Sequence, residues 1–327
     1  MKVLFNTYSV AFDCPGGGEI QLLKTKEALE KSGVEVELFN SWNPRLGSFE
    51  LVHYFSVQGG SLPFCAYVKK RGLPLVISPI LWLGDEAREK YPVGEIKDLL
   101  NLCDLILPNS KAEAGLLSGF FGIPIDKFYV TRNGVDPGFA EAISPDIFFK
   151  HHHLSKPFLL NVANIEARKN QINLIKALQG TGLELVIAGK IRDQAYFEEC
   201  LKLGNGFVKY IGYLEHGSEL LKSAYRACEL FVLPSLLETP GLSALEAAAA
   251  GAKVVITEVG CAREYFEDRV TYVSPLDLAG ITRGILQEMS KKRNAELKNH
   301  VLKNFLWSQT AAQVREAYSK VLQKRRA

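Results

Sequence analysis

The sequence predicts an α/β protein with two parallel-sheet domains that face each other across a cleft. Short β-rich runs alternate with helical stretches along the whole chain, which is typical of parallel sheets with helices on both faces. This alternation breaks once near the middle of the chain and then starts again. The length of 327 residues suits two units of about 150 residues each better than one unit.

The composition allows two packed cores and gives no indication of a nucleic-acid partner. Apolar residues make up 47% of the chain and charged residues 23%, an ordinary balance for a globular protein. The net charge of +3 is only mildly basic. The six cysteines lack the spacing of a metal site or a redox pair, which favours a reducing compartment.

Nothing in the sequence has the layout of a signal peptide or a membrane span. The chain passes from Met1 directly into an expected strand, and its longest uncharged run, residues 72–84, is too short to cross a bilayer. We therefore expect a cytoplasmic protein. Basic clusters at residues 69–71, 291–293 and 324–326 are interpreted as solvated helix ends, and peripheral contact with an acidic membrane is the alternative.

The first half of the chain contains six expected strands and four expected helices. The strands are expected at 3–6, 34–39, 51–55, 75–78, 105–108 and 128–131, and the helices at 18–32, 62–71, 96–103 and 111–120.

Residues 137–157 lose this alternation and are interpreted as the crossing between domains. They contain three prolines and the run His151-His152-His153. Neighbouring side chains on a linker point in different directions, so we do not expect these histidines to bind a metal. We place the first domain at residues 1–150 and the second at 151–306.

The second half repeats the pattern of the first. Strands are expected at 158–163, 183–188, 207–211, 230–234 and 253–257, with a helix at 170–178 and mainly helix after Pro275. Ligands of such sheets bind at the carboxyl ends of the strands, so polar residues in the turns after these strands are the candidates for a site.

The most informative segment runs from residue 233 to residue 246. A buried strand gives way to a loop that carries Glu238, and a helix then begins at Gly241. The first amides of a helix have no partner inside the helix and carry the positive end of its dipole. The start of this helix is therefore an expected site for an anion such as a phosphate.

Glu246 is the single charged residue on the expected helix 241–252. A carboxylate on so apolar a helix is unfavourable unless a partner compensates for its burial. Two interpretations stay open. The carboxylate binds the hydroxyls of a diol such as ribose, or it pairs with a nearby backbone group or arginine.

Two further segments point to phosphate. Arg168 and Lys169 stand at the turn that leads into the helix at 170–178, where the helix dipole disfavours cations unless an anion is also present. The glycines at positions 16–18 follow the first strand and allow a close approach of the backbone to a ligand. A flexible loop explains these glycines equally well, and their spacing is not that of a dinucleotide site.

These segments together resemble the large fourth family of retaining glycosyltransferases, which has the GT-B fold of two Rossmann-like domains. The pair Glu238 and Glu246 is similar to the Glu-x7-Glu element of that family, and the resemblance covers most of the chain. It implies that Glu238 contacts the donor sugar and that Glu246 holds the ribose hydroxyls. The amides of Gly241 and Leu242, with Ser243 beside them, would face the pyrophosphate.

The resemblance extends to the cations, with one departure. Lys169 aligns with the lysine of the family, but Ala163-Asn164 replaces its usual Gly-Arg pair. We expect Lys169 to act in catalysis with Glu238 and Asn164 to contact the donor. Whether Arg168 supplies the missing second cation stays open.

The remaining expected contacts follow from the same resemblance. Gly16, Gly17 and Gly18 would abut the donor phosphate and the acceptor, Gly189 would lie at the level of the cleft, and Tyr213 would lie near the nucleobase. His53 either contacts the acceptor or is a satisfied core histidine. The histidine that follows the next strand in many relatives is replaced here by Ser78-Pro79-Ile80.

The predicted reaction is transfer of a hexose from a UDP-, GDP- or ADP-linked sugar to a saccharide, lipid or small-molecule acceptor, with retention at the anomeric carbon. No cofactor or metal is expected, because the cations and the helix start would balance the phosphate charge. The terminal helix, residues 307–327, would pack back on the first domain. The alternatives are a sugar-nucleotide epimerase of the same fold and a non-catalytic sugar-nucleotide-binding protein.

Overall fold

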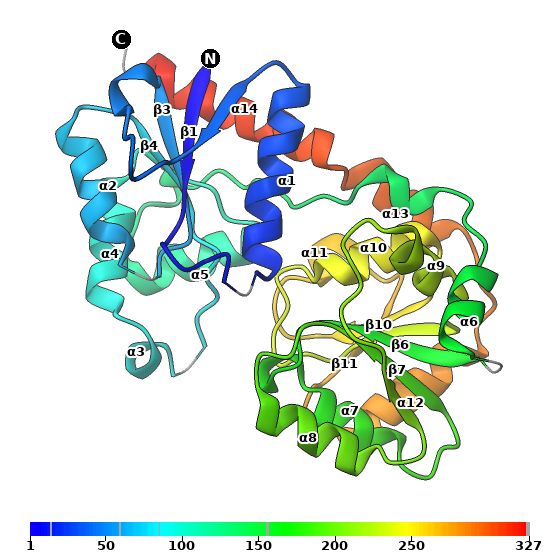
Figure 1. The fold of residues 1–327 in the computed structure, drawn as a ribbon. Coiled ribbons are helices and arrows are strands. Elements are labelled where there is room, and N and C mark those ends of the chain that lie inside the picture. Colours follow the sequence, from blue (N-terminus) through cyan, green and yellow to red (C-terminus); the bar gives the residue numbers. More distant parts are fainter. Residues whose placement is uncertain (14, 59, 85, 155–156, 325–327) are drawn as a thin grey trace. The chain divides into compact units, whose positions relative to one another are not determined.

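The computed structural model describes residues 1–13, 15–58, 60–84, 86–154 and 157–324. The chain forms two compact units, one made of Met1–Gly134 together with the segment from Trp307 onward, and the other of Val135–Leu306 (Figure 1). The chain thus divides after Gly134 and not after residue 150, and the terminal segment belongs to the first unit.

The first unit is built on a five-stranded parallel sheet in the order β2-β1-β3-β4-β5. Its strands are β1 (Lys2–Asn6), β2 (Glu35–Leu38), β3 (Leu51–Phe55), β4 (Leu75–Ser78) and β5 (Leu105–Ile106). Its helices are α1 (Gly17–Lys31), α2 (Ser61–Lys70), α3 (Ala87–Lys90), α4 (Val93–Leu102), α5 (Lys111–Phe121) and α14 (Trp307–Lys324), with 3-10 turns η1 (Leu46–Ser48) and η2 (Ile125–Lys127).

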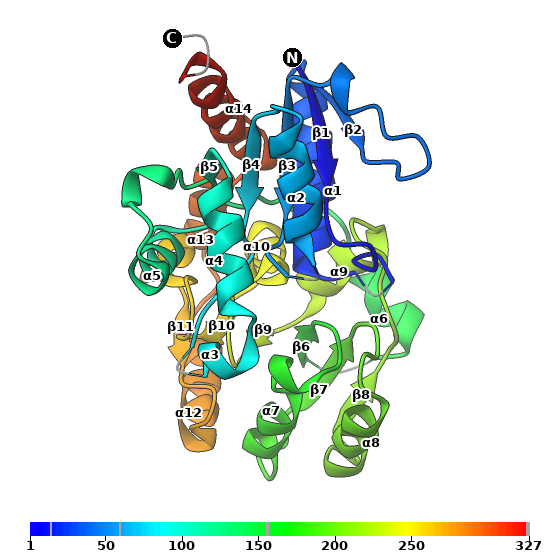
Figure 2. The ribbon, with the colours of Figure 1, turned by 90° about the vertical axis from the view of Figure 1, so that its left-hand side faces the viewer.

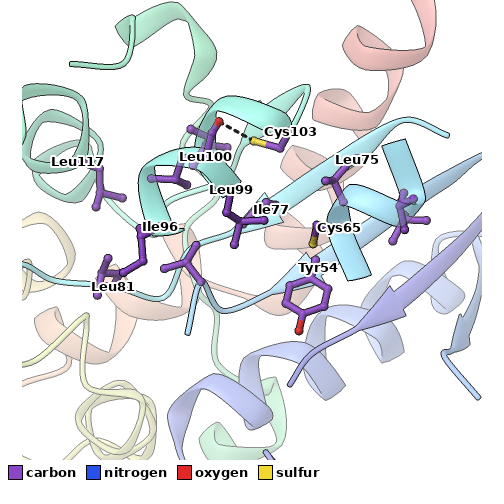
Figure 3. Close-up of a cluster of buried hydrophobic side chains, with 14 of the residues drawn as sticks. Tyr54, Cys65, Leu75, Ile77, Leu81, Ile96, Leu99, Leu100, Cys103 and Leu117 are labelled. Atoms are coloured by element: carbon purple, nitrogen blue, oxygen red, sulfur yellow. Dashed lines mark hydrogen bonds between the residues drawn. The ribbon is translucent and has the colours of Figure 1, made fainter. Parts of the chain in front are cut away.

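Helices cover both faces of this sheet, which explains why every residue of β3 and β4 is buried. Figure 2 shows α2 and α4 in front of the sheet, with α1 and α14 on the other side. Side chains from β3, β4, α4 and α5 meet in one core cluster, shown in Figure 3. There the Cys103 thiol donates to the Leu100 carbonyl oxygen at 3.2 Å, and burial raises the pKa of Cys103 to about 12.

The strand expected at residues 128–131 is wrong. Phe128 forms an isolated bridge with Ile106, and the Tyr129 and Thr131 amides donate to the carbonyl oxygens of Ile106 and Pro108 at 2.8 and 2.9 Å. Since β5 has two residues and proline lacks an N–H group, the neighbouring backbone cannot extend a ladder.

The terminal helix α14 packs against α1 in the first unit (Figure 1). Its buried residues recur every three or four positions, which is the stripe of an amphipathic helix. Those residues are Trp307, Thr310, Ala311, Val314, Ala317, Tyr318 and Val321.

The second unit is built on a six-stranded parallel sheet in the order β11-β10-β9-β6-β7-β8. Its strands are β6 (Phe158–Val162), β7 (Glu184–Ala188), β8 (Val208–Tyr210), β9 (Leu230–Leu233), β10 (Val254–Thr257) and β11 (Thr271–Val273). Its helices are α6 (Asp146–His152), α7 (Gln171–Leu178), α8 (Gln194–Leu203), α9 (Glu219–Ala227), α10 (Leu242–Ala250), α11 (Arg263–Phe266), α12 (Leu278–Ser290) and α13 (Glu296–Asn304), with 3-10 turns η3 (Pro137–Ala140) and η4 (Ala167–Lys169).

The interpretation of residues 137–157 as a linker is wrong for the described residues up to 154. They form η3 and α6, and α6 packs against α9 within the second unit. Phe148 on α6 is fully buried, and its amide donates to the Ser223 hydroxyl at 3.0 Å. The short helix lies between prolines, which hid its apolar side in the sequence. The three-residue strand β11 was not expected either, because it is shorter than the usual strand pattern.

The turns after the central strands of this second sheet are joined to one another. Ile165, after β6, bridges Ile191, after β7, and Glu238, after β9, bridges Gly260, after β10. In a parallel sheet the carboxyl ends of all strands lie at one edge, so the turns that carry the predicted donor residues meet there.

Candidate functional site

An ion pair between Lys169 and Glu238 lies at the carboxyl edge of the second sheet. Lys169 ends η4, after β6, and Glu238 lies in the loop after β9. The Lys169 Nζ atom is 2.5 Å from Glu238 Oε1, and the two side chains are 14% and 6% exposed. The structure thus brings the two residues that were predicted to act in catalysis into direct contact.

The turn that carries Lys169 is held by Asn170, a residue that the sequence analysis did not select. Asn170 has a left-handed backbone with a φ of 61°. Its buried side-chain amide donates to the carbonyl oxygens of Pro234 at 2.8 Å and Pro275 at 2.7 Å. One asparagine therefore fixes three turns, including the one that leads to Glu238. Asparagine adopts this backbone more readily than most residues, which is the signal that sequence analysis had available.

The loop that carries Glu238 is fixed from the other side by Gly260. The Glu238 amide donates to the Val259 carbonyl oxygen at 3.2 Å, and the Cys261 amide donates to the Glu238 carbonyl oxygen at 3.1 Å. Gly260 has a φ of +111°, and a Cβ atom at this position would lie 2.0 Å from the Glu238 carbonyl oxygen. Only glycine fits, because a side chain would displace the backbone of the loop.

Burial lowers the pKa of Lys169, and the nearby Arg168 lowers it further, whereas the negative charge of Glu238 raises it. A buried ammonium group of this kind interacts strongly with an incoming anion, because little water screens it. Glu238 in turn presents carboxylate oxygens next to this cation, and these accept hydrogen bonds from hydroxyl groups.

The start of α10 lies beside this ion pair. Gly241 caps the helix with a φ of +89°, and a Cβ atom there would lie 3.5 Å from Glu238 Oε2. The Gly241 carbonyl oxygen accepts the amides of Ala244 and Leu245. The preceding amides, those of Leu242 and Ser243, occupy the positions at which a helix start offers N–H groups to an anion.

Glu246, farther along α10, is buried and has internal partners. His216 Nε2 lies 2.9 Å from Glu246 Oε1, and the Tyr225 hydroxyl donates to Oε2 at 2.8 Å. Glu246 is therefore paired internally, but with a histidine and a tyrosine in place of the expected backbone group or arginine, and its contact with ribose hydroxyls stays a prediction. Neither residue was selected from the sequence, since both lie in segments without a recognisable motif.

A family model described as "Glycosyl transferases group 1" matches residues 144–319, more than half of the chain. The chain belongs to this family. The O-antigen chain mannosyltransferase B of Escherichia coli is 25% identical over 247 residues, which are 71% of this chain and 64% of that protein. The chain thus matches less than two thirds of the length of this curated relative.

Solved structures confirm the expected GT-B fold of this group 1 glycosyltransferase. Sucrose-phosphate synthase from Thermosynechococcus elongatus is similar with a TM-score of 0.83 at 17% identity, covering 99% of this chain and 100% of that chain. HepE from Anabaena, solved in complex with UDP and glucose, has a TM-score of 0.78 at 20% identity, covering 98% of this chain and 100% of that chain.

The Ala163-Asn164 pair, at which the sequence was expected to depart from the family pattern, lies close to Gly189. A Cβ atom on Gly189, which has a φ of +156°, would lie 1.8 Å from the Ala163 carbonyl oxygen. The Asn164 carbonyl oxygen accepts from Gln171 at 3.0 Å. Arg168 is half exposed and forms an ion pair with Glu166 at 2.9 Å, so the structure pairs it with a neighbouring carboxylate. Arg168 and Asn164 stay predicted donor contacts.

Tyr213 is exposed in the loop after β8. The Lys190 ammonium lies 5.0 Å from the centre of its ring, which is a cation–π contact. The Gly189 amide donates to the Gly212 carbonyl oxygen at 2.9 Å, so the backbone links this loop to the turn after β7. An exposed aromatic face at this edge is compatible with the predicted contact to a nucleobase.

The glycine segment at positions 16–18 belongs to the first unit, and Cys14 before it lies outside the described residues. Gly16 caps α1, and Gly17 and Gly18 form its first residues. The Glu19 carboxylate accepts the Gly16 amide at 2.6 Å. The segment is therefore a helix start that is partly occupied by its own carboxylate, and its contact with a donor phosphate stays a prediction.

The structure contradicts an acceptor contact for His53. The ring is 1% exposed, Nδ1 lies 2.7 Å from the Tyr318 hydroxyl, and Nε2 lies 2.9 Å from the Ser78 hydroxyl. Burial lowers the pKa of His53 from 6.5 to about 3, so the ring is neutral near pH 7. His53 is a core residue of the first unit, and both of its nitrogens are already engaged.

Other features of the described residues lie away from this site. A cavity of about 690 Å³ in the first unit is lined by residues at the starts of β4 and β5 and on α14, and none of the predicted site residues lines it. In the described ranges, no cluster of three or more histidine, cysteine, aspartate or glutamate residues could hold a metal ion. None of the helices in those ranges has the length and apolar character needed to cross a membrane.

Proposed function

We propose that this chain transfers a hexose from a nucleoside-diphosphate sugar to a saccharide, lipid or small-molecule acceptor with retention at the anomeric carbon. The observation that carries the proposal is the buried pair of Lys169 and Glu238 beside the start of α10. A cation, a helix start and a carboxylate at one sheet edge suit a ligand with a diphosphate next to a group rich in hydroxyls.

Each part of this arrangement has a role in the proposed reaction. The Lys169 ammonium and the amides of Leu242 and Ser243 offset the charge that develops on the departing diphosphate. Glu238 orients the donor sugar through hydrogen bonds from its hydroxyls. Arg168 adds positive charge nearby, and Glu246 holds the ribose. These groups supply the charge balance, so we expect transfer without a metal.

Retention follows if the acceptor attacks on the face from which the diphosphate leaves. The bond from the acceptor oxygen to the anomeric carbon forms as the bond from that carbon to the phosphate oxygen breaks. The acceptor proton passes to the departing phosphate, which serves as the base. No side-chain base is then required, which agrees with Ser78 at the position where many relatives are expected to have a histidine.

The relatives narrow the first substrates to test. HepE was solved with UDP and with UDP-glucose, and the similar Escherichia coli protein is named as an O-antigen chain mannosyltransferase. We therefore propose UDP-linked hexoses and GDP-mannose as the first donors and oligosaccharides as the first acceptors, with ADP-linked hexoses and with lipid and small-molecule acceptors in parallel.

The test is incubation of the protein with labelled UDP-, GDP- and ADP-hexoses and these acceptors, followed by NMR of the product linkage. Glu238→Gln should lower the transfer rate at least about 100-fold, which is the usual effect of losing one contact to the transition state. Glu199→Gln, at an exposed position on α8, is the control and should leave the rate unchanged. An inverted linkage would contradict retention. Donor binding without turnover would favour a binding protein, and acceptor-independent epimerisation of the donor would favour an epimerase.

A further inference from the structure

Glu246 is held by two donors from two different segments. His216 lies in the loop between β8 and α9, and Tyr225 lies on α9. Each donor contacts a different carboxylate oxygen, at 2.9 and 2.8 Å. A carboxylate bonded through both oxygens cannot rotate freely about its last side-chain bond, so its orientation is fixed before any ligand binds.

The bonding pattern leaves acceptor capacity on both oxygens. An ionised carboxylate only accepts hydrogen bonds, so His216 Nε2 carries the proton in this contact. Burial and the negative charge of Glu246 raise the pKa of Tyr225 well above its usual range, so its hydroxyl stays protonated and donates. A carboxylate has about four lone-pair positions. Two are used here, and one on each oxygen remains for the two O–H groups of a vicinal diol.

The two donors are themselves fixed by packing. The Phe139 ring, on η3, makes edge contacts with the His216 and Tyr225 rings. The distances between ring centres are 5.7 Å to His216 and 5.9 Å to Tyr225. Tyr225 is fully buried and also contacts Phe231 on β9. The two donors to Glu246 are therefore packed against other aromatic side chains.

We infer that His216 and Tyr225 are positioning residues that hold Glu246 for the ribose of the donor, and that they thereby set a preference for ribonucleotides over 2′-deoxyribonucleotides. The inference rests on the proposed function, because it takes the ligand to be a nucleoside diphosphate. It goes beyond that function by assigning sugar discrimination to two side chains outside the Glu-x7-Glu element.

The test compares the dissociation constants of UDP, GDP and ADP with those of their 2′-deoxy forms by calorimetry. The wild-type protein should bind the preferred ribonucleotide at least about tenfold more tightly than its deoxy form, which is the usual effect of one hydrogen bond to a charged group. Tyr225→Phe and His216→Leu should reduce this ratio toward one by weakening only the ribonucleotide. His216→Gln, which keeps an amide donor near the position of Nε2, should restore most of the ratio.

Tyr272→Phe is the matched control, because this tyrosine also donates its hydroxyl within the second unit, to the Glu267 carbonyl oxygen. It should keep the wild-type ratio. The inference is overturned if the ratio in Tyr225→Phe and His216→Leu stays at the wild-type value, or if both nucleotide forms weaken equally, which is the result of a purely structural role. If the wild type binds ribonucleotides and their 2′-deoxy forms equally well, the inference is overturned but the proposed function is not. A wild type that binds none of the three overturns the proposed function as well.

Discussion

Lys169 and Glu238 show how two residues can be linked in stability and in chemistry. Both side chains are mostly buried, and their charged atoms are 2.5 Å apart. Removing one partner of a buried pair leaves the other charge without compensation, which destabilises a protein more than removing both. The arrangement is maintained by Asn170 and Gly260, which hold the two turns in place.

Lys169→Met should lower the free energy of unfolding by about 3 kcal/mol, because it leaves the Glu238 carboxylate buried without its cation. The double variant Lys169→Met/Glu238→Gln should recover part of that loss, while both variants lose transfer activity. Urea unfolding of the wild type, both single variants and the double variant gives the coupling energy. Strictly additive losses would show that the pair contributes no coupling.

His53 makes stability depend on pH. Its pKa falls from 6.5 in the unfolded chain to about 3 in the folded protein, so the unfolded state binds a proton between these values that the folded state excludes. The contribution of the neutral ring is complete above pH 6.5 and is lost as the pH falls toward 3.

We expect the free energy of unfolding to fall by about 2 kcal/mol between pH 7 and pH 5 because of His53, at about 1.4 kcal/mol for each pH unit below 6.5. His53→Gln should remove this part of the pH dependence, whereas His151→Gln, at an exposed position, should keep it. The measurement is urea unfolding at both pH values. If the free energy of unfolding falls equally in the wild type and in His53→Gln between pH 7 and pH 5, His53 is not the group responsible.

At the scale of elements, the candidate site depends on close contacts between turns. The turns after β6, β7, β9 and β10 touch through backbone atoms at Gly189 and Gly260, where any side chain would clash with the neighbouring carbonyl group. Loops built in this way hold their side chains in fixed positions, because their backbone has little freedom to move. The sequence shows each glycine but not the backbone that approaches it.

Gly260→Ala should destabilise the protein by about 2 kcal/mol more than Gly206→Ala, because its Cβ atom would overlap the Glu238 carbonyl oxygen. Gly206 is a matched control, since it also has a left-handed backbone (φ +92°) but no atom within 4 Å of an added Cβ. Thermal unfolding measures the stability, and donor affinity reports the position of the Glu238 loop. Equal effects of the two substitutions would argue against a tight contact at Gly260.

At the scale of the whole molecule, the first unit is discontinuous in sequence and the second is continuous. The α14 helix, more than 170 residues after Gly134, supplies Tyr318 to the buried contact with His53 in the first unit. The first unit therefore lacks part of its core until the end of the chain is present.

Residues 135–306 expressed alone should fold, since this unit has its own sheet and core. Residues 1–134 alone should not, because they lack α14. Joining residues 307–324 to residue 134 through a flexible linker should restore cooperative unfolding, which circular dichroism with urea can follow. Cooperative unfolding of residues 1–134 by themselves would show that α14 is dispensable.

The sequence predicted those elements and site residues that depend on a local pattern. The alternation of elements gave the two sheets, and polar residues after buried strands gave Lys169 and Glu238, because parallel strands end at one edge. The pattern failed at α6, whose short apolar side lies between prolines, and at residues 128–131, whose partner strand is too short to extend. It also failed to select Asn170, His216 and Tyr225, which act through distant partners.

The sequence by itself determined the fold class, the family and the segments that bear the candidate chemistry, because these depend on periodicity and on motifs within a few residues. Only the tertiary structure decided which side chains are partners. It paired Lys169 with Glu238, gave Glu246 two internal donors and placed His53 against Tyr318, 265 residues away. The physical reason is that a hydrogen bond depends on distance and direction between atoms, and packing sets both across segments that no local pattern connects.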